Sequence, residues 1–246
     1  MQVTRNMEKK GISINCGGVR KSCNSLYVCK SENMRKDLAN GIVIVFNEEV
    51  YIPSDDTFIL VNGAHYAIEK FSKKFLTIVE LGCGTGYASI STLKKALNKG
   101  FSNVYAVLID ISPCATKSAL KSIEANELGV YADVVQCDSA SCLREKLFGL
   151  ILFNPPYLPV KDYGDWLAES WSGGEEGLDI WRKFFTDSLR ICEKDCLIVF
   201  VVSSLQNLTE IFKKMLSNCK NIEIIECRSF FYETICSVCC TAGDTS

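Results

Sequence analysis

The sequence has only one histidine, His65, and lacks any run of apolar residues long enough to cross a bilayer. Its longest apolar run, residues 196–202, is far shorter than the roughly 20 residues of a membrane-spanning helix. Residues 1–11 carry charges with no apolar segment behind them, so we do not expect a secretory signal peptide. His65 lies in a helix-like stretch and is expected to be structural. These absences point away from a membrane protein and from histidine-based chemistry.

The 14 cysteines do not follow the pattern of a disulfide scaffold. Several lie inside apolar runs, where a reduced cysteine behaves as a small hydrophobic residue; examples are Cys114, Cys192, Cys196 and Cys236. The cysteines of residues 235–240 suggest half of a zinc site, but no second close-spaced cysteine pair or histidine pair completes four ligands. We therefore predict no bound metal, reduced cysteines and a cytoplasmic location.

Charge divides the chain into two parts. Residues 1–40 contain eight basic and three acidic side chains, whereas the remainder contains 19 basic and 26 acidic ones. We expect a basic N-terminal extension over residues 1–40 and one catalytic domain over residues 41–246. The acidic balance of that domain argues against broad contact with a phosphate backbone.

Apolar segments that alternate with helix-like segments predict an α/β fold. Seven strands are expected, at residues 77–82, 103–110, 132–138, 149–154, 196–202, 221–227 and 233–240. Continuous apolar strands with long connections indicate a mostly parallel sheet covered by helices on both faces. The last two strands have only a short connection, which favours an antiparallel C-terminal pair. We also expect a hairpin over residues 41–53, a short helix over 141–147 and a capping box from Ser203 to Gln206.

A glycine-rich turn follows the first strand of the sheet. Gly82, Gly84 and Gly86 lie where a chain leaves a buried strand and begins a helix, a place where backbone approaches a ligand closely. A dinucleotide fingerprint needs a further glycine, which the tyrosine at position 87 replaces. Glu80 adds a negative charge before the turn. A cationic, single-nucleoside ligand such as S-adenosylmethionine therefore fits this turn better than a pyrophosphate.

Acidic residues also follow the next two strands. Asp110 ends the second strand, where a carboxylate can accept both hydroxyls of a ribose. Asp138 ends the third and can accept a hydrogen bond from the amino group of adenine. Since ligands of open α/β sheets bind at the carboxyl ends of strands, the combination predicts a nucleoside cofactor there.

A rigid Asn-Pro-Pro-Tyr corner ends the fourth strand at residues 154–157. The topological switch of such a sheet places this strand beside the first, so that Asn154 faces the glycine turn. The Asn154 side-chain oxygen and the Pro155 carbonyl could orient a planar NH2 group, and the ring of Tyr157 could pack against that flat group. Methyl transfer to that nitrogen needs positioning and electrostatics rather than a general base.

With these residues in place, the chain resembles the HemK-like release-factor glutamine methyltransferases, in particular their shorter archaeal and eukaryotic branch. The resemblance runs from about residue 41 to 240. The segments that carry it are VYIPSDDTFIL, VELGCGTG, the Asp110 segment, LFNPPY, WSGGEEGLDIWRKFF and ETICSV. The Asn-Pro-Pro-Tyr corner alone is shared with nucleic-acid amino methyltransferases, whereas the first and fifth segments together are considerably more specific for this family.

The resemblance implies a Rossmann-like, seven-stranded class I methyltransferase fold with S-adenosylmethionine as cofactor. It implies a glutamine of a Gly-Gly-Gln loop in a peptide-chain release factor as substrate, and a small zinc-containing activator subunit as partner. By the same resemblance Asn154, Pro155 and Tyr157 hold the target amide. The expected cofactor-binding residues are Asp56, Thr57, Glu80, Gly82, Cys83, Gly84, Asp110, Ile111, Asp138, Ser139 and Asn154.

Two other interpretations stay open. The same chemistry could act on an amino group of adenine or guanine in RNA or DNA, and the basic extension would suit that substrate. The acids of residues 161–180 argue for a basic protein loop instead. A catalytically idle binding subunit would be expected to lack Asn154 or the glycines. The chain departs from the family in its N-terminal cysteines Cys16, Cys23 and Cys29, and in Cys83 and Cys137 beside the cofactor motifs, which raises the question of redox sensitivity.

Overall fold

The structure, a computed structural model, describes residues 29, 31, 33–38, 40–71, 75–160 and 164–243. Within these residues seven strands form one sheet in the order β5-β4-β3-β6-β7-β9-β8. Its strands are β3 (Phe75–Leu81), β4 (Asn103–Asp110), β5 (Ala132–Gln136), β6 (Phe148–Phe153), β7 (Cys192–Ser203), β8 (Cys219–Ser229) and β9 (Thr234–Ala242). The strand β9 runs antiparallel to both of its neighbours, β7 and β8, whereas the other paired strands of the sheet are parallel. The predicted mostly parallel sheet with an antiparallel C-terminal strand is confirmed.

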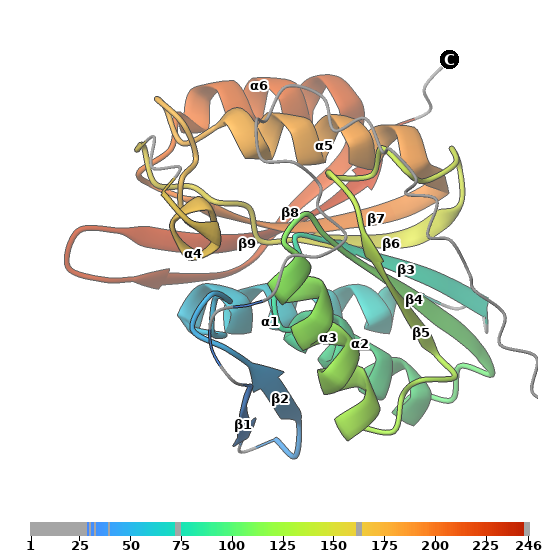
Figure 1. Ribbon diagram of the computed structural model, residues 1–246. Helices are drawn as coiled ribbons and strands as arrows, with labels where there is room; N and C mark the ends of the chain where they lie inside the picture. The colour runs from blue at the N-terminus through green and yellow to red at the C-terminus, as the bar shows by residue number, and fades with distance from the viewer. Residues whose placement is uncertain are drawn as a thin grey trace, which may run out of the picture.

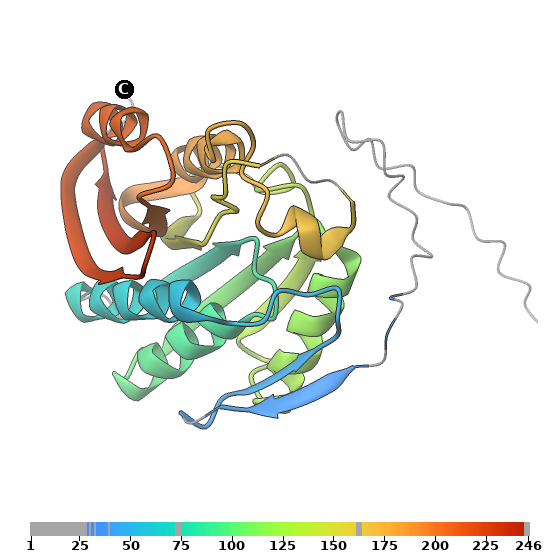
Figure 2. The ribbon, with the colours of Figure 1, turned by 90° about the vertical axis from the view of Figure 1, so that its left-hand side faces the viewer.

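Helices cover both faces of this sheet (Figures 1 and 2). One face carries α1 (Asp55–Lys70), α2 (Tyr87–Asn98) and α3 (Pro113–Ala125), and the other carries α5 (Asp179–Ile191) and α6 (Leu208–Asn218). A short helix, α4 (Trp166–Glu169), lies between these layers near the ends of the strands (Figure 1). None of the helices in the described ranges is both long enough and apolar enough to cross a membrane.

Successive residues of the central strands belong alternately to two separate hydrophobic cores, one on each face of the sheet. Ile78 of β3 and Leu150 of β6 belong to the core under α1–α3, whereas Val79 and Ile151 belong to the core under α5 and α6. All four side chains are fully buried. Because side chains of a strand point alternately to opposite faces, a strand buried on both sides must be apolar throughout. This requirement explains the uninterrupted apolar runs of the sequence.

The sheet has its topological switch between β3 and β6. The chain builds β3, β4 and β5 outward to one edge and then returns to place β6 on the other side of β3. The ladder pairs Leu81 with Phe153, so that Gly82 and Asn154 leave the sheet side by side. The fold thereby brings the glycine turn and the Asn-Pro-Pro-Tyr corner to one crevice.

The predicted hairpin over residues 41–53 is wrong in its pairing. Strand β2 (Val43–Phe46) pairs with β1 (Met34–Asp37), which precedes it, and residues 47–53 contain no strand. Strand β2 also contacts α3, where Val45 N donates a hydrogen bond to the Ser122 hydroxyl at 2.9 Å. This two-stranded ladder joins residues on both sides of the expected boundary at residue 40. Most of the expected basic extension, with Cys16 and Cys23, lies outside the described residues. The division at residue 40 stays a prediction.

Two local predictions also differ from the structure. Residues 141–147 form turns rather than a helix, and the guanidinium of Arg190 binds the carbonyls of Ala140 and Leu143 instead of a helical ladder. Helix α6 begins at Leu208, where Asn207 caps it by accepting from Glu210 N at 3.3 Å. The expected contact from Ser203 to Gln206 exists, but it closes the turn before the helix.

The expectation of reduced cysteines is contradicted by the structure. Ten of the 12 described cysteines are paired as disulfides: Cys29–Cys114, Cys137–Cys142, Cys192–Cys196, Cys219–Cys240 and Cys227–Cys236. Strand register, which the sequence does not reveal, makes Cys227 and Cys236 direct cross-strand neighbours. Cys83 and Cys239 are free and buried. The cytoplasmic location stays a prediction.

Candidate active site

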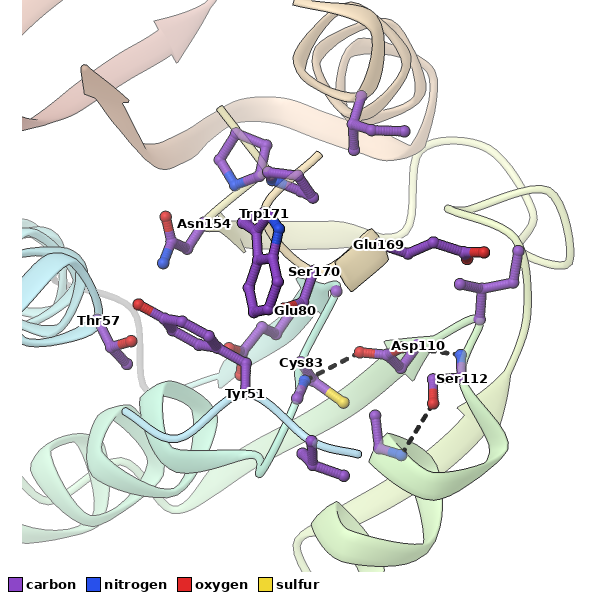
Figure 3. A pocket seen from close by; sticks show the side chains of 18 of the residues that line it. Tyr51, Thr57, Glu80, Cys83, Asp110, Ser112, Asn154, Glu169, Ser170 and Trp171 are labelled. Carbon is purple, nitrogen blue, oxygen red and sulfur yellow. Dashed lines mark hydrogen bonds between the residues drawn. The ribbon is translucent and has the colours of Figure 1, made fainter. Parts of the chain in front are cut away.

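A cavity of about 990 Å³ opens at the carboxyl ends of β3, β4 and β6. Every predicted site residue lines it: Asp56, Thr57, Glu80, Gly82, Cys83, Gly84, Asp110, Ile111, Asp138, Ser139, Asn154, Pro155 and Tyr157. Figure 3 shows that the pocket has two ends. Asp110 and Ser112 lie at one end, while Asn154, Tyr51 and Trp171 gather at the other. We call these the Asp110 end and the Asn154 end.

The glycine turn and Asp110 support each other. Gly82, Gly84 and Gly86 all have positive φ angles, between 53° and 79°, which side chains with a Cβ rarely adopt. Gly84 N donates to one Asp110 carboxylate oxygen at 2.9 Å, and Ser112 N donates to the other at 2.8 Å. Burial raises the pKa of Asp110 above its usual value, although these backbone donors oppose the shift. The carboxylate is thus fixed in one orientation before any ligand arrives.

Glu80 is a buried carboxyl group beneath the turn. It is 5% exposed and accepts hydrogen bonds from Ser89 N at 2.9 Å and from the Ser89 hydroxyl at 2.5 Å. Burial raises the pKa of Glu80 to about 7, and the two donors from Ser89 only partly offset that effect. A nearby positive charge would favour the ionised form of Glu80. The Asp110 end is therefore suited to a cationic ligand.

The segment after β5 adds one ion pair and one unpartnered hydroxyl to the pocket. Asp138 pairs with Lys183 Nζ at 2.5 Å, and Lys183 itself lines the cavity. Ser139 follows with a φ of 53° and is 4% exposed, and its Oγ has no hydrogen-bond partner among the described residues. Because Ser139 also lines the cavity, its hydroxyl is available to a polar atom of a ligand.

The Asn154 end contains a second unpartnered atom. The side-chain oxygen of Asn154 is buried and accepts no hydrogen bond within the described part of the chain. Pro155 and Pro156 follow it and restrict the backbone, because each proline ring fixes φ. An acceptor oxygen is thus held at the crevice with its hydrogen-bonding capacity unused.

Asp56 organises the side chains around Asn154. Tyr51 donates to the two carboxylate oxygens of Asp56 at 3.1 and 3.0 Å, and the Tyr157 hydroxyl donates to Oδ2 at 3.5 Å. Thr57 N also donates to Asp56, at 2.6 Å. Burial, followed by the charge of Asp56, raises the pKa of both tyrosines far above the usual value, so both remain protonated donors. The structure thereby places Asp56 beside the Asn-Pro-Pro-Tyr corner.

Glycines of the segment after α4 pack directly against that corner. A Cβ on Gly173 would lie 2.8 Å from the Pro156 carbonyl oxygen, and one on Gly177 would overlap the carbonyl oxygen of Tyr157. Leu158 N donates to Trp171 O at 3.1 Å, and Gly173 N donates to Leu158 O at 2.9 Å. This packing gives a physical reason for the Trp-x-Gly-Gly-x-x-Gly segment to accompany Asn-Pro-Pro-Tyr.

Sequence reasoning did not assign several residues that line the pocket. They include Tyr51, Ser112, Trp171, Lys183 and Glu233. All five lie inside or beside segments that the resemblance singled out, and this position was the only signal that the sequence offered for them. The sequence indicated the segments that contain these residues. It did not reveal what their side chains do, because that depends on tertiary contacts between loops.

Comparison of the sequence with known proteins identifies related proteins and a matching family. The methyltransferase small domain family matches residues 59–226. A Methanocaldococcus jannaschii protein, provisionally assigned as a protein N5-glutamine methyltransferase, is 29% identical over 71% of this chain and 83% of its own length. The mouse methyltransferase HEMK2 is 28% identical over 68% of this chain and 78% of its own. The release factor glutamine methyltransferase of Bacillus anthracis is matched over only 56% of its length, at 28% identity.

Solved structures show the same fold. The 16S rRNA N2 G1207 methyltransferase of T. thermophilus, solved with AdoMet and guanosine, aligns with a TM-score of 0.61 at 13% identity, over 85% of this chain and 50% of its own. The Mtq2–Trm112 complex of E. cuniculi, described as responsible for methylation of the eRF1 termination factor, aligns with a TM-score of 0.53 at 18% identity. That alignment covers 79% of this chain and 99% of the other.

Proposed function

Because this chain belongs to the methyltransferase small domain family, we propose that it methylates the side-chain amide nitrogen of a glutamine in a peptide-chain release factor. The methyl donor is S-adenosylmethionine, and the target is the glutamine of the Gly-Gly-Gln motif. Relatives that carry the name of release factor glutamine methyltransferase support this substrate, as does the Mtq2–Trm112 complex, described as responsible for methylation of eRF1. One observation within the pocket carries the proposal furthest.

That observation is the unpartnered oxygen of Asn154. A buried acceptor without a donor is destabilising by about 1–3 kcal/mol, and a ligand that supplies an N–H group to Asn154 would remove that penalty. A carboxamide NH2 offers two such donors. With one held by Asn154 and the other by the Pro155 carbonyl, the nitrogen would present its face to the Asp110 end of the pocket.

The residues of the Asp110 end fit S-adenosylmethionine. The buried carboxyl of Glu80 suits a ligand with an ammonium and a sulfonium group, and the oriented carboxylate of Asp110 suits the two ribose hydroxyls. The unpartnered Ser139 hydroxyl suits a polar atom of the adenine. When bound, S-adenosylmethionine supplies an electrophilic methyl group.

The chain's own contribution to the reaction is positioning and electrostatics. An amide nitrogen is a poor nucleophile because its lone pair is delocalised into the carbonyl. Acceptors aimed at its two hydrogens stabilise the positive charge that grows on nitrogen during transfer, and the proton is lost to water afterwards. Tyr157 is held by Asp56 and restricts the amide to one plane. No general base is needed, which agrees with the single structural histidine.

The expected small zinc-containing activator subunit is part of the proposal. The Mtq2–Trm112 complex provides the support for a small partner of that kind. The zinc of that partner and the need for it in this protein are inferred from the family resemblance. We therefore propose that the active species is a heterodimer.

The alternative substrate is an amino group of RNA or DNA. Glu169 of α4 lines the cavity, and Glu175, Glu176 and Asp179 follow in the chain, where Glu176 and Asp179 pair with Arg182. The net acidic charge of this segment favours a basic protein loop over a phosphate backbone. The protein substrate is for this reason the better supported one.

Transfer of labelled methyl groups tests the proposal. The full chain with the activator would be given S-adenosylmethionine, and release factor and total RNA would be offered in parallel, each with wild type and Asn154→Ala. We expect label on the release factor only, and only with wild type. Label on RNA alone, with the steep salt dependence of phosphate contacts, would contradict the protein substrate.

A further inference from the structure

The β8–β9 hairpin ends in three consecutive exposed aromatic residues. Phe230 is 42% exposed, Phe231 is 101% exposed and Tyr232 is 93% exposed. Phe230 N donates to Glu233 O at 2.6 Å, so Phe231 and Tyr232 form the two-residue turn. Such turns favour asparagine, aspartate and glycine for their backbone angles. Turn geometry therefore does not account for two large aromatic side chains at this position.

This aromatic tip, residues 230–232, is mounted on a rigid support. Just behind it the disulfide Cys227–Cys236 joins the two strands across a Cα–Cα distance of 4.1 Å. The hydroxyls of Ser229 and Thr234 contact each other at 3.0 Å, and Thr234 N donates to the Ser204 hydroxyl at 2.9 Å. Figure 1 shows the hairpin extending beyond the other strands of the sheet. Exposed aromatic groups on a pre-ordered hairpin bind a partner with little loss of conformational freedom.

The tip is continuous with the Asn154 end of the pocket. Glu233, the residue after Tyr232, lines the cavity and accepts from the Ser203 hydroxyl at 2.6 Å. Arg228, on the other strand, pairs with Asp55 at 3.3 Å, and Asp55 directly precedes Asp56. The hairpin is thus anchored to the elements that hold the acceptor side of the site. A partner seated on the tip would lie beside the Asn154 end of the pocket.

We propose that the aromatic tip is the docking surface for the body of the protein substrate whose glutamine enters the pocket. This inference rests on the proposed function. A glutamine side chain alone offers few contacts, so selection of one residue in one protein needs a second contact outside the pocket. Aromatic residues are enriched where protein interfaces concentrate their binding energy. Glu233, which follows the tip and lines the cavity, suits a basic group on the substrate, whereas the charge of Asp55 is already paired with Arg228.

The experiment compares the double variant Phe231→Ala/Tyr232→Ala with wild type in the intact complex with the activator. Phe75→Ala is the matched control, since Phe75 is 62% exposed and begins β3 at the end of the strand opposite the pocket. We expect KM for intact release factor to rise at least about tenfold in the double variant, with kcat within about twofold of wild type. The dissociation constant of S-adenosylmethionine and the melting temperature should match those of wild type. Phe75→Ala should change none of these quantities.

Several outcomes would overturn the inference. An unchanged KM for release factor would show that the tip does not contact the substrate. Loss of activator binding or of self-association in the double variant, at unchanged KM, would assign the tip to a different partner. If wild type itself does not methylate release factor, the proposed function fails and the docking inference fails with it. If wild type is active and only the KM effect is missing, the docking inference alone is wrong.

Discussion

At the Asp110 end of the pocket, the carboxylates of Asp110 and Glu80 already accept hydrogen bonds from the chain, whereas at the other end the Asn154 oxygen accepts none from the described residues. The first arrangement fixes charged groups for a ligand that must be held in one pose. In the second, the proposed substrate amide would complete a neutral acceptor. We therefore propose that one cavity separates binding of the methyl donor from recognition of the nitrogen that receives the methyl group.

Because of this difference, substitutions at the two ends should affect different steps of the reaction. Loss of a group at the Asn154 end should lower the rate of transfer while cofactor binding persists. Loss of a group at the Asp110 end should weaken cofactor binding first. The following changes test that separation, from the largest expected effect to the smallest.

Asn154→Ala should have the largest effect. Removal of its oxygen leaves the target amide with one acceptor, and deletion of one preorganised group of this kind typically lowers kcat by about 10²- to 10³-fold. The dissociation constant of S-adenosylmethionine should change by less than about threefold, because the residues of the Asp110 end are untouched. Steady-state kinetics and calorimetry measure the two quantities. An equal loss of cofactor affinity would show that Asn154 serves the cofactor.

Gly177→Ala should distort the Asn-Pro-Pro-Tyr corner. Its φ is +67°, and an added Cβ would overlap the carbonyl oxygen of Tyr157. Gly100→Ala is the matched control, with a φ of +87° and no atom within 4 Å of the added Cβ. The control should lose about 1–2 kcal/mol of unfolding free energy from backbone strain alone. Gly177→Ala should lose more and should also lower kcat by about tenfold or more, as a displaced reacting group does. Equal effects of both variants would refute the packing argument.

Glu80→Gln tests the electrostatics of the Asp110 end. Since the pKa of Glu80 is raised to about 7, the cationic cofactor should bind more tightly as pH rises through that value and Glu80 ionises. Binding should release a proton near pH 6, measurable by calorimetry in two buffers of different ionisation enthalpy. In Glu80→Gln this pH dependence should disappear, and affinity at pH 8 should fall by about tenfold. A pH-independent affinity in wild type would contradict the role of Glu80.

The same group predicts how stability without cofactor depends on pH. Between about pH 4.5 and 7 the folded protein retains the Glu80 proton and the unfolded chain does not. Stability from this group is therefore fully present below about pH 4.5 and is lost as pH rises to about 7, by roughly 3 kcal/mol. Urea unfolding at several pH values, compared with Glu80→Gln, measures this slope. Parallel curves for the two proteins would rule out the assignment to Glu80.

Ser139→Ala should have the smallest effect. Its hydroxyl lines the pocket and has no hydrogen-bond partner in the part of the chain that the structure describes. The buried hydroxyl of Ser188 on α5 has no partner there either, but it does not line the pocket. Loss of one neutral hydrogen bond to the cofactor should weaken S-adenosylmethionine binding by about three- to tenfold. Ser188→Ala should leave this affinity unchanged. If both variants bind the cofactor like wild type, Ser139 makes no contact with it.

The sheet and the Asp110 end could be predicted from the sequence because they follow from short-range rules. Apolar strands that alternate with helices fix a parallel sheet, and the glycines and acids at successive strand ends must meet at one edge of it. Asn154 was placed by the same topological argument. For these residues, position along the chain determines position in the fold.

The remaining features depend on contacts that sequence spacing does not encode. The Tyr51–Asp56–Tyr157 cluster forms because a loop before α1 meets the corner after β6. The pairing of Cys227 with Cys236 depends on the register of β8 and β9, which contains an irregularity between Ile224 and Glu226. Glu233 reaches the pocket from the last hairpin of the chain. Tertiary packing, rather than local pattern, determines each of these contacts.

The most direct test of the central claim is a crystal structure of the complex with S-adenosylhomocysteine and a release factor. The account predicts that the glutamine amide nitrogen lies about 2.9 Å from both the Asn154 side-chain oxygen and the Pro155 carbonyl oxygen. A glutamine amide that lies beyond about 3.5 Å from Asn154, with the Asn154 oxygen bound to the cofactor instead, would contradict it.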